Sequence, residues 1–238
     1  MNVLVLENCC QLTNDTLKVI SNHGKCITSL SVSFCYKLDD EGISMITENC
    51  INLKELNICY CIRLTDDTLK SIAKDMNFIT NLNIAKCYQM TEDGVLQVLE
   101  KCVHLRRLHM DFSTNSFQDY PLAENGLTDL TLKKIVRFST ALTYLILGAD
   151  CMFTGKEIIK VINCCKELKL LDIRSCYIEW TTESLKTGID EKYFQSLKGK
   201  NPTLKILDDH CYHNCNYDYD NFEDWEDTEW EDYNYCSD

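Results

Sequence analysis

Cysteine and histidine are the residue types in this sequence that could bind a metal ion or form a nucleophilic centre. The chain has 16 cysteines and 5 histidines, and two of each lie within the six residues 210–215. This spacing matches no zinc finger, and four ligands so close together would strain a tetrahedral site. We therefore predict no metal site and interpret the segment as the end of the folded part, with zinc binding as the alternative.

No catalytic motif accompanies these residues. The sequence contains no phosphate-binding G-x-x-x-x-G-K-[ST] loop, no G-x-S-x-G nucleophile elbow and no H-E-x-x-H zinc motif. Since cysteines are so frequent, a cysteine near a histidine is expected by chance and does not indicate a catalytic pair. We therefore expect a protein that is not an enzyme and that needs no cofactor.

Many of the cysteines instead follow an internal repeat of 26 residues. The same spacing relates leucines, further apolar positions and a threonine–aspartate step. The leucine column is Leu4, Leu30, Leu56, Leu82 and Leu108, and the cysteine column is Cys9, Cys35, Cys61 and Cys87, with Cys176 following after insertions. This period is typical of leucine-rich repeats, in which each unit is a strand plus a helix. We predict about seven to eight repeats over residues 1–207, stacked because each buries its apolar side only against its neighbours.

The spacing of strands and helices predicts the shape of this stack. Neighbouring strands lie about 4.8 Å apart, whereas helices need about 10 Å, so the array must curve. We predict an α/β leucine-rich-repeat solenoid: a right-handed horseshoe with a concave parallel sheet and helices on the convex side. Two repeats have longer loops, near 114–125 and 178–189, which should project from the same rim. They are either functional loops or tolerated insertions.

The net charge of −13 is concentrated at the C-terminal end. Residues 208–238 contain 12 acidic residues and no lysine or arginine, and the remaining chain has 25 acidic and 24 basic residues. No basic stripe for nucleic acid is present. We interpret residues 208–238 as an acidic, aromatic tail. It is either free, docked on the concave face near Lys86, Arg107 and Arg174, or a short motif that binds a basic partner.

The expected compartment follows from the cysteines and from the lack of targeting segments. No run of about 18 apolar residues predicts a membrane span, and the first residues lack the pattern of a signal peptide. Free thiols buried in a repeat are typical of a reducing environment. We therefore expect a cytoplasmic or nuclear protein.

The residues between the inward-facing leucines should form an exposed concave surface. Just before the cysteines, one column holds Phe34, Tyr60, Lys86 and Phe112 at the repeat spacing. Aromatic and arginine side chains are common anchors of protein interfaces. The predicted partner-binding residues on the concave face are Phe34, Tyr60, Lys86, Arg107, His109, Phe112, Tyr144 and Arg174.

Residues 50–72 read C-x-x-L-x-x-L-x-I-x-x-C-x-x-L-T-D-x-x-L-x-x-I. This unit resembles the cysteine-containing leucine-rich repeat of F-box/leucine-rich-repeat proteins and of the antagonist-of-mitotic-exit-network family, whose fold is of the ribonuclease-inhibitor type. In F-box proteins, such repeats hold substrates of an SCF-type ubiquitin ligase, and a separate F-box docks on the adaptor. The resemblance covers about residues 1–207 and includes no F-box, so it implies only the substrate-holding surface.

The resemblance and the concave surface together favour a protein–protein interaction module. We therefore expect a role in selecting substrates for SCF-type ubiquitin-dependent protein degradation, with ubiquitin-ligase subunits as further candidate partners. The alternative is a ligand or peptide sensor, or a scaffold, without a ligase link. A sensor would use the two long loops as the rim of a pocket.

Overall fold

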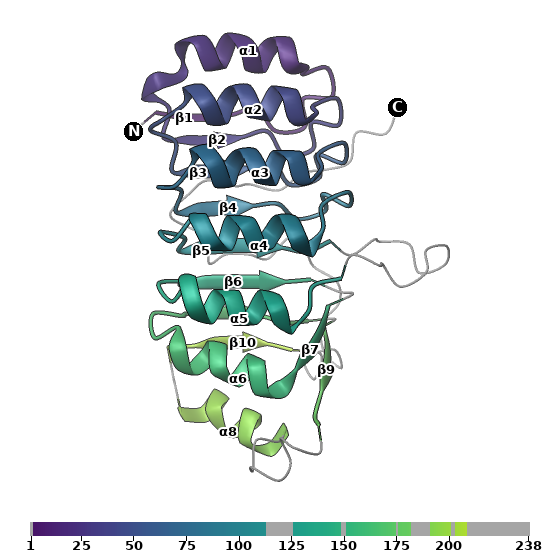
Figure 1. Ribbon diagram of the computed structural model, residues 1–238, viewed down its shortest axis with the longest axis vertical. Coiled ribbons are helices and arrows are strands. Elements are labelled where there is room, and N and C mark those ends of the chain that lie inside the picture. The colour runs from purple at the N-terminus through teal and green to yellow at the C-terminus, as the bar shows by residue number, and fades with distance from the viewer. Residues whose placement is uncertain are drawn as a thin grey trace, which may run out of the picture.

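The computed structural model describes residues 2–112, 126–148, 151–174, 176–181, 191–200 and 203–208. Its main element is a parallel sheet of eight strands in the order β1-β2-β3-β4-β5-β6-β8-β10, so each strand lies beside that of the next repeat. The helices stack along one face of this sheet (Figure 1). The predicted α/β repeat fold with a parallel sheet is confirmed, whereas the horseshoe curvature and its handedness stay predictions.

Each repeat supplies a short strand and, in most cases, a helix of ten residues. The strands of the main sheet are β1 (Val3–Val5), β2 (Ser29–Ser31), β3 (Glu55–Asn57), β4 (Asn81–Asn83), β5 (Arg107–Met110), β6 (Tyr144–Leu147), β8 (Leu170–Asp172) and β10 (Lys205–Leu207). The helices are α1 (Asn14–His23), α2 (Asp40–Asn49), α3 (Asp66–Asp75), α4 (Glu92–Lys101), α5 (Asp129–Phe138), α6 (Gly155–Cys164) and α8 (Glu191–Lys200), and a 3-10 turn, η1 (Gly24–Cys26), follows α1.

The leucine column forms the line along which the repeats pack. Leu56 pairs in register with Leu30 on one side and Leu82 on the other. These three leucines are at most 2% exposed, and the residues on either side of Leu56 and Leu82 are only partly buried. From the helix side, Leu69 and Ile72 of α3 complete the same buried cluster. The 26-residue spacing therefore predicted the core correctly.

The cysteines of the repeat join each unit to the one before it. The Sγ atoms of Cys61 and Cys87 donate hydrogen bonds to the carbonyl oxygens of Val32 and Ile58, at 3.2 and 3.1 Å. Cys35 donates in the same way to Leu6, at 3.2 Å. Burial raises the pKa of the Cys35 thiol to about 11, so at neutral pH the sulfur keeps the proton that it donates. The prediction of buried thiols is thus confirmed for Cys35, Cys61 and Cys87, whereas Cys9, in the first repeat, is exposed. No disulfide joins one described cysteine to another.

A second set of hydrogen bonds joins the starts of successive helices. The Asp40 carboxylate accepts from the backbone N–H and hydroxyl of Thr65, at 2.9 and 2.8 Å, and from the hydroxyl of Thr68, at 2.6 Å. The same arrangement links Asp66 to Thr91, Glu92 to Thr128 and Asp129 to Thr154. Helix starts have N–H groups without partners in the helix, and here the previous repeat supplies some of the acceptors. This contact accounts for the repeated threonine–aspartate step.

The two predicted loops have different outcomes. Residues 114–125 lie outside the described residues. The second segment, 178–189, begins as a strand, because β9 (Tyr177–Glu179) pairs in parallel with β7 (Met152–Thr154). Isolated bridges at the same place in earlier repeats, such as Thr65 with Gln89, show that β7 and β9 extend a pairing already present there. The prediction of a loop throughout 178–189 is therefore wrong for its first residues, and 182–190 are not described.

Two further predictions meet the structure only in part. Among the described residues, no helix has the length and apolar character needed to cross a membrane. The predicted tail, 208–238, contributes only Asp208 to the described part of the chain, so its alternatives stay predictions.

Candidate functional site

The face of the sheet away from the helices is called the open face. On this face, the turn after each of the first strands places one side chain at the carboxyl end of the strand. In the turn Ile58–Cys61, the Cys61 N–H donates to the Ile58 carbonyl oxygen at 3.2 Å. The third residue of this turn, Tyr60, has a φ of 57°. We call the residues that share this conformation the left-handed column: Asn8, Phe34, Tyr60 and Lys86, with φ between 57° and 60°.

Contacts with the next repeat hold Tyr60 in this conformation. Its backbone N–H donates to the carbonyl oxygen of Ala85, at 2.9 Å. One residue earlier, the N–H of Cys59 donates to the side-chain oxygen of Asn57, at 3.0 Å. Left-handed backbone favours glycine or asparagine and costs other residues about 1–2 kcal/mol. The chain thus has bulky side chains at positions where glycine or asparagine would cause less backbone strain.

Three aromatic rings meet at the carboxyl ends of neighbouring strands. Phe34 stacks on Tyr60 with centroids 4.6 Å apart and an interplanar angle of 15°, and Tyr88 meets Tyr60 edge-on at 6.3 Å and 88°. All three are half-buried, and the nearby Tyr36 is 39% exposed. Burial raises the pKa of the Tyr88 hydroxyl, so it stays neutral. We call Phe34, Tyr36, Tyr60 and Tyr88 the aromatic cluster.

Only half of this cluster was predicted from the sequence. Phe34 and Tyr60 were expected on the concave face, whereas Tyr36 and Tyr88 were missed. These two residues share a column of their own at the 26-residue spacing, two positions after the left-handed column, with Ile62 between them. The repeat that located the first pair could therefore have located the second.

Lys86 and Phe112 are buried, and the expectation that they are exposed is wrong. Lys86 is 4% exposed, because its Nζ turns to the Asp111 carboxylate of the next repeat, at 2.8 Å. Phe112 is 8% exposed and belongs to the buried apolar cluster. Neither side chain offers a partner the free surface that the column pattern predicted.

His109 lies on the open face in the middle of the sheet, next to Asn83 and Ile146 on the adjacent strands. Loss of hydration lowers the pKa of its imidazole to about 4, although the carboxylates of Asp111 and Asp172 act in the opposite direction. The ring is therefore neutral at physiological pH and can both donate and accept a hydrogen bond.

The remaining predicted residues interact with neighbouring side chains. The guanidinium of Arg174 donates two hydrogen bonds to the buried Asp172 carboxylate, at 3.0 and 2.6 Å. At the other end of the strands, the guanidinium of Arg107 lies 4.8 Å from the ring centre of Tyr144. The structure thus joins Phe34 to Tyr60 and Arg107 to Tyr144, but these two pairs lie at opposite ends of the strands.

The arrangement suits recognition by surface contact. Within the described ranges, no group of three or more histidine, cysteine, aspartate and glutamate residues could hold a metal ion. The alternative zinc site near residues 209–215 falls outside those ranges. What the open face presents is aromatic area, a neutral histidine and charges that have partners, the kind of surface that protein interfaces use.

No protein-family model matches the chain, and no curated protein matches it in sequence. Among solved structures, it is similar to the Rad7 and Elc1 complex in yeast, with 14% identity and a TM-score of 0.34 over 87% of this chain and 75% of the other. It is also similar to the tropomodulin C-terminal domain of Caenorhabditis elegans, with 11% identity and a TM-score of 0.38 over 70% of this chain and 83% of the other. Likenesses at this level carry no functional argument.

Proposed function

We propose that this protein is a non-enzymatic recognition module, a right-handed horseshoe of leucine-rich repeats that binds another protein on the open face of its sheet. The observation that carries the proposal is the pair Phe34 and Tyr60 in left-handed backbone. A strained conformation persists only where its surroundings enforce it, and it often marks a functional site. Here two adjacent repeats add bulky rings to that conformation and leave them partly exposed.

The chemistry of the aromatic cluster fits this role. Large rings offer contact area, lose little side-chain entropy on binding and often dominate the affinity of an interface. Because Phe34 and Tyr60 already stack on each other, a partner meets a preformed surface. His109 adds a neutral donor and acceptor on the same face.

The resemblance of the repeats to F-box/leucine-rich-repeat proteins supports a narrower proposal. The partner would be a substrate selected for SCF-type ubiquitin-dependent degradation, in the cytoplasm or nucleus. The alternative sensor, with its pocket between 114–125 and 178–189, depends largely on residues outside the described ones and stays a prediction.

An affinity capture tests the proposal. The unchanged chain, the Phe34→Ala/Tyr60→Ala double variant and a Tyr177→Ala control would each be immobilised and exposed to cell extract. Tyr177 is a suitable control because it is 63% exposed and lies on β9, outside the main sheet. We expect at least one protein to bind the unchanged chain and the control, and to lose about tenfold or more in affinity for the double variant.

The two levels of the proposal fail in different ways. If the double variant keeps the circular dichroism of the unchanged chain and captures the same proteins equally well, the open face is not the binding surface. If capture depends on the two rings but ubiquitin-ligase subunits are never among the captured proteins, the ligase role is wrong and the recognition module remains.

A further inference from the structure

A groove lies on the helical side of the molecule, between α3 and α4. Its volume is about 460 Å³. On each helix the lining residues follow the first one by three and four positions, so they form two facing stripes. They are Lys70, Ala73 and Lys74 of α3, with Asn77 just after this helix, and Gln97, Glu100 and Lys101 of α4.

The sequence of the two helices explains where the groove forms. Near the start of α4, Gly94 lets the helices approach closely, because a Cβ atom there would lie 2.6 Å from Cδ1 of Leu69. Toward the other end of the pair, the small side chain of Ala73 lines the groove and leaves space between the longer ones. Close contact at one end and a small residue at the other thus open the groove toward the rim where the strands begin.

Lysines outnumber carboxylates in the lining of the groove, but one of them has an ion pair on its own helix. Of the three lysines, Lys70 pairs with Asp67, one turn earlier on α3, at 2.7 Å, and the one lining carboxylate, Glu100, is paired with Lys134 of α5. The nearest carboxylate oxygens to the Nζ of Lys74 are long contacts of 3.7 and 3.9 Å, and this lysine side chain is 71% exposed. Lys74 and Lys101 lie in the last turns of their helices, where a cation offsets the helix dipole. They are therefore the lysines that an acidic ligand would meet.

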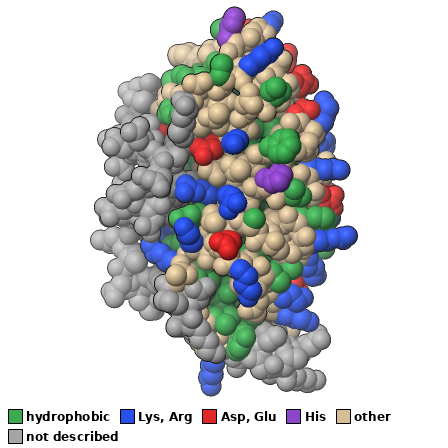
Figure 2. Space-filling view, turned by 90° about the vertical axis from the view of Figure 1, so that its left-hand side faces the viewer, with side chains coloured by type: hydrophobic (Ala, Val, Ile, Leu, Met, Phe, Trp, Pro, Cys, Tyr) green, Lys and Arg blue, Asp and Glu red, His purple; other side chains and the backbone are tan. Residues whose placement is uncertain are grey.

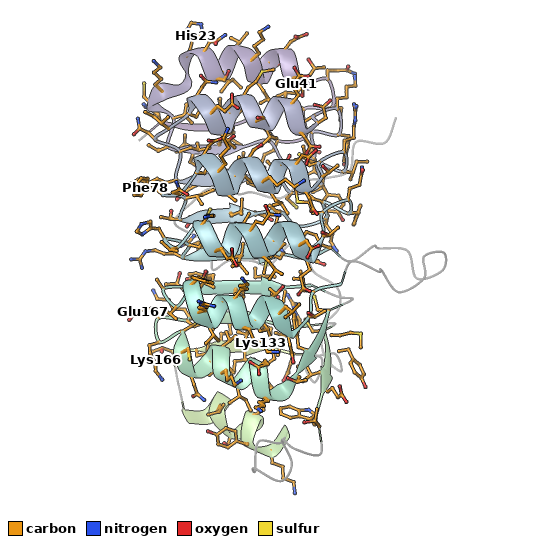
Figure 3. The ribbon with its side chains drawn as sticks, viewed as in Figure 1. His23, Glu41, Phe78, Lys133, Lys166 and Glu167 are labelled. Atoms are coloured by element: carbon orange, nitrogen blue, oxygen red, sulfur yellow. The ribbon has the colours of Figure 1, made fainter. Side chains whose placement is uncertain are left out.

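Exposed apolar side chains stand at the open end of the groove. Phe78 directly follows the lining residue Asn77 and is 70% exposed, and it stacks on the imidazole of His104 with centroids 5.5 Å apart. In the loops of the two adjacent repeats, Ile51 and Val103 are 71% and 44% exposed. Figure 3 shows Phe78 projecting from the rim, and Figure 2 shows that lysine and arginine side chains spread along the same rim.

Cationic and apolar surface side by side defines the chemistry of the ligand. A simple anion would not need the rings, and an uncharged apolar partner would gain nothing from the lysines. We propose that the α3–α4 groove, together with Phe78, binds an acidic segment of a partner protein. Its carboxylates would lie against Lys74 and Lys101, and an apolar side chain would pack on Phe78.

This second site is independent of the aromatic cluster. The groove lies between helices, and the cluster lies on the open face of the sheet, so the two sites can be occupied by different proteins. A module with both sites could hold a target on one face and a second protein on the other.

A peptide selection tests the proposal without knowledge of the natural partner. A displayed library of random peptides would be selected against the unchanged chain and against the Lys74→Glu/Lys101→Glu variant. We expect the peptides enriched only on the unchanged chain to be rich in aspartate and glutamate around one apolar residue. Enrichment of neutral or basic peptides, or the same enrichment on both proteins, would overturn the proposal.

Affinities of the best peptide then locate the site. Fluorescence anisotropy should show a loss of about tenfold or more for Lys74→Glu/Lys101→Glu and for Phe78→Ala, and weaker binding as salt rises. Two controls should bind as the unchanged chain does: Lys133→Glu, an exposed lysine on α5, and Leu130→Ala, which is 54% exposed. Equal losses in the controls would contradict the assignment.

Two further measurements separate the possible results. The Phe34→Ala/Tyr60→Ala variant should bind the peptide with the affinity of the unchanged chain. A negative result for the open face would therefore leave the proposal for the groove standing, and the reverse. If the groove variants instead lose binding to a labelled single-stranded oligonucleotide, and the unchanged chain binds no acidic peptide, the groove recognises phosphates and the acidic-protein proposal is wrong.

Discussion

Two adjacent columns of the repeat differ in their role. One is the cysteine column of Cys35, Cys61 and Cys87, and the other is the left-handed column just before it. The cysteine side chains are fully buried, and each donates a hydrogen bond to the preceding repeat. The left-handed column has one backbone conformation but four different residues, from asparagine to phenylalanine. Positions one residue apart therefore differ in what constrains them: contacts between repeats in one column, and backbone strain in the other.

The difference teaches how to interpret a repeat. A residue type that recurs in every unit meets the same need in every unit, here the carbonyl oxygen of the neighbour. Where the backbone recurs but the side chain varies, the interface between repeats leaves the side chain unspecified. Such positions are available for recognition, unless a neighbouring repeat occupies the side chain.

Lys86 is the exception in the left-handed column, because a neighbouring repeat buries its side chain. Its replacement should therefore have the largest effect on the stability of the fold. Lys86→Met removes the cation that balances Asp111, whose side chain is only 12% exposed. Removing one member of a buried ion pair leaves a charge without compensation and costs roughly 3–5 kcal/mol. We expect a loss of about 3 kcal/mol in the free energy of unfolding, measured by urea denaturation.

A matched variant controls for the loss of a lysine as such. Lys37→Met replaces an exposed lysine whose Nζ donates to Gln11 of the previous repeat. It should change stability by less than about 0.5 kcal/mol. Equal effects of the two variants would mean that the Lys86–Asp111 pair does not stabilise the stack, and that Lys86 belongs with the recognition residues after all.

The cysteine column should give a smaller but uniform effect. Cys61→Ala removes a buried sulfur together with its hydrogen bond to Val32, and we expect about 1–2 kcal/mol of destabilisation in the same urea measurement. Cys9→Ala is the internal control, because Cys9 holds the same position in the first repeat but is exposed. Destabilisation of similar size in both variants would refute the role of the bond between repeats.

Most of the architecture could be predicted because the apolar spacing has one physical meaning. Leu30, Leu56 and Leu82 can be buried together only if successive strands pair in register, so the repeat alone determines the order of the sheet. The recurring threonine–aspartate step was visible in the same way, but its role, shown by the bond from Thr65 to Asp40 of the previous repeat, came only from the structure.

The details that the sequence did not reveal depend on contacts between side chains of different repeats. Nothing in the column pattern distinguishes Lys86, which is buried by Asp111, from Tyr60, which remains partly exposed. The strand β9 was missed because an insertion hides the periodicity that marks a strand. The left-handed backbone was missed because its usual residues, glycine and asparagine, occupy only one of the four positions.

The smallest change in stability should come from Phe34→Asn, which also tests the comparison most directly. Asparagine tolerates left-handed backbone and already occupies this column at position 8, so the change relieves about 1 kcal/mol of strain. It also removes the stacking on Tyr60, which is worth about as much. We expect the urea midpoint to shift little and capture of the open-face partner to weaken by about tenfold. Loss of stability without loss of binding would place Phe34 with the cysteines as a residue that joins repeats.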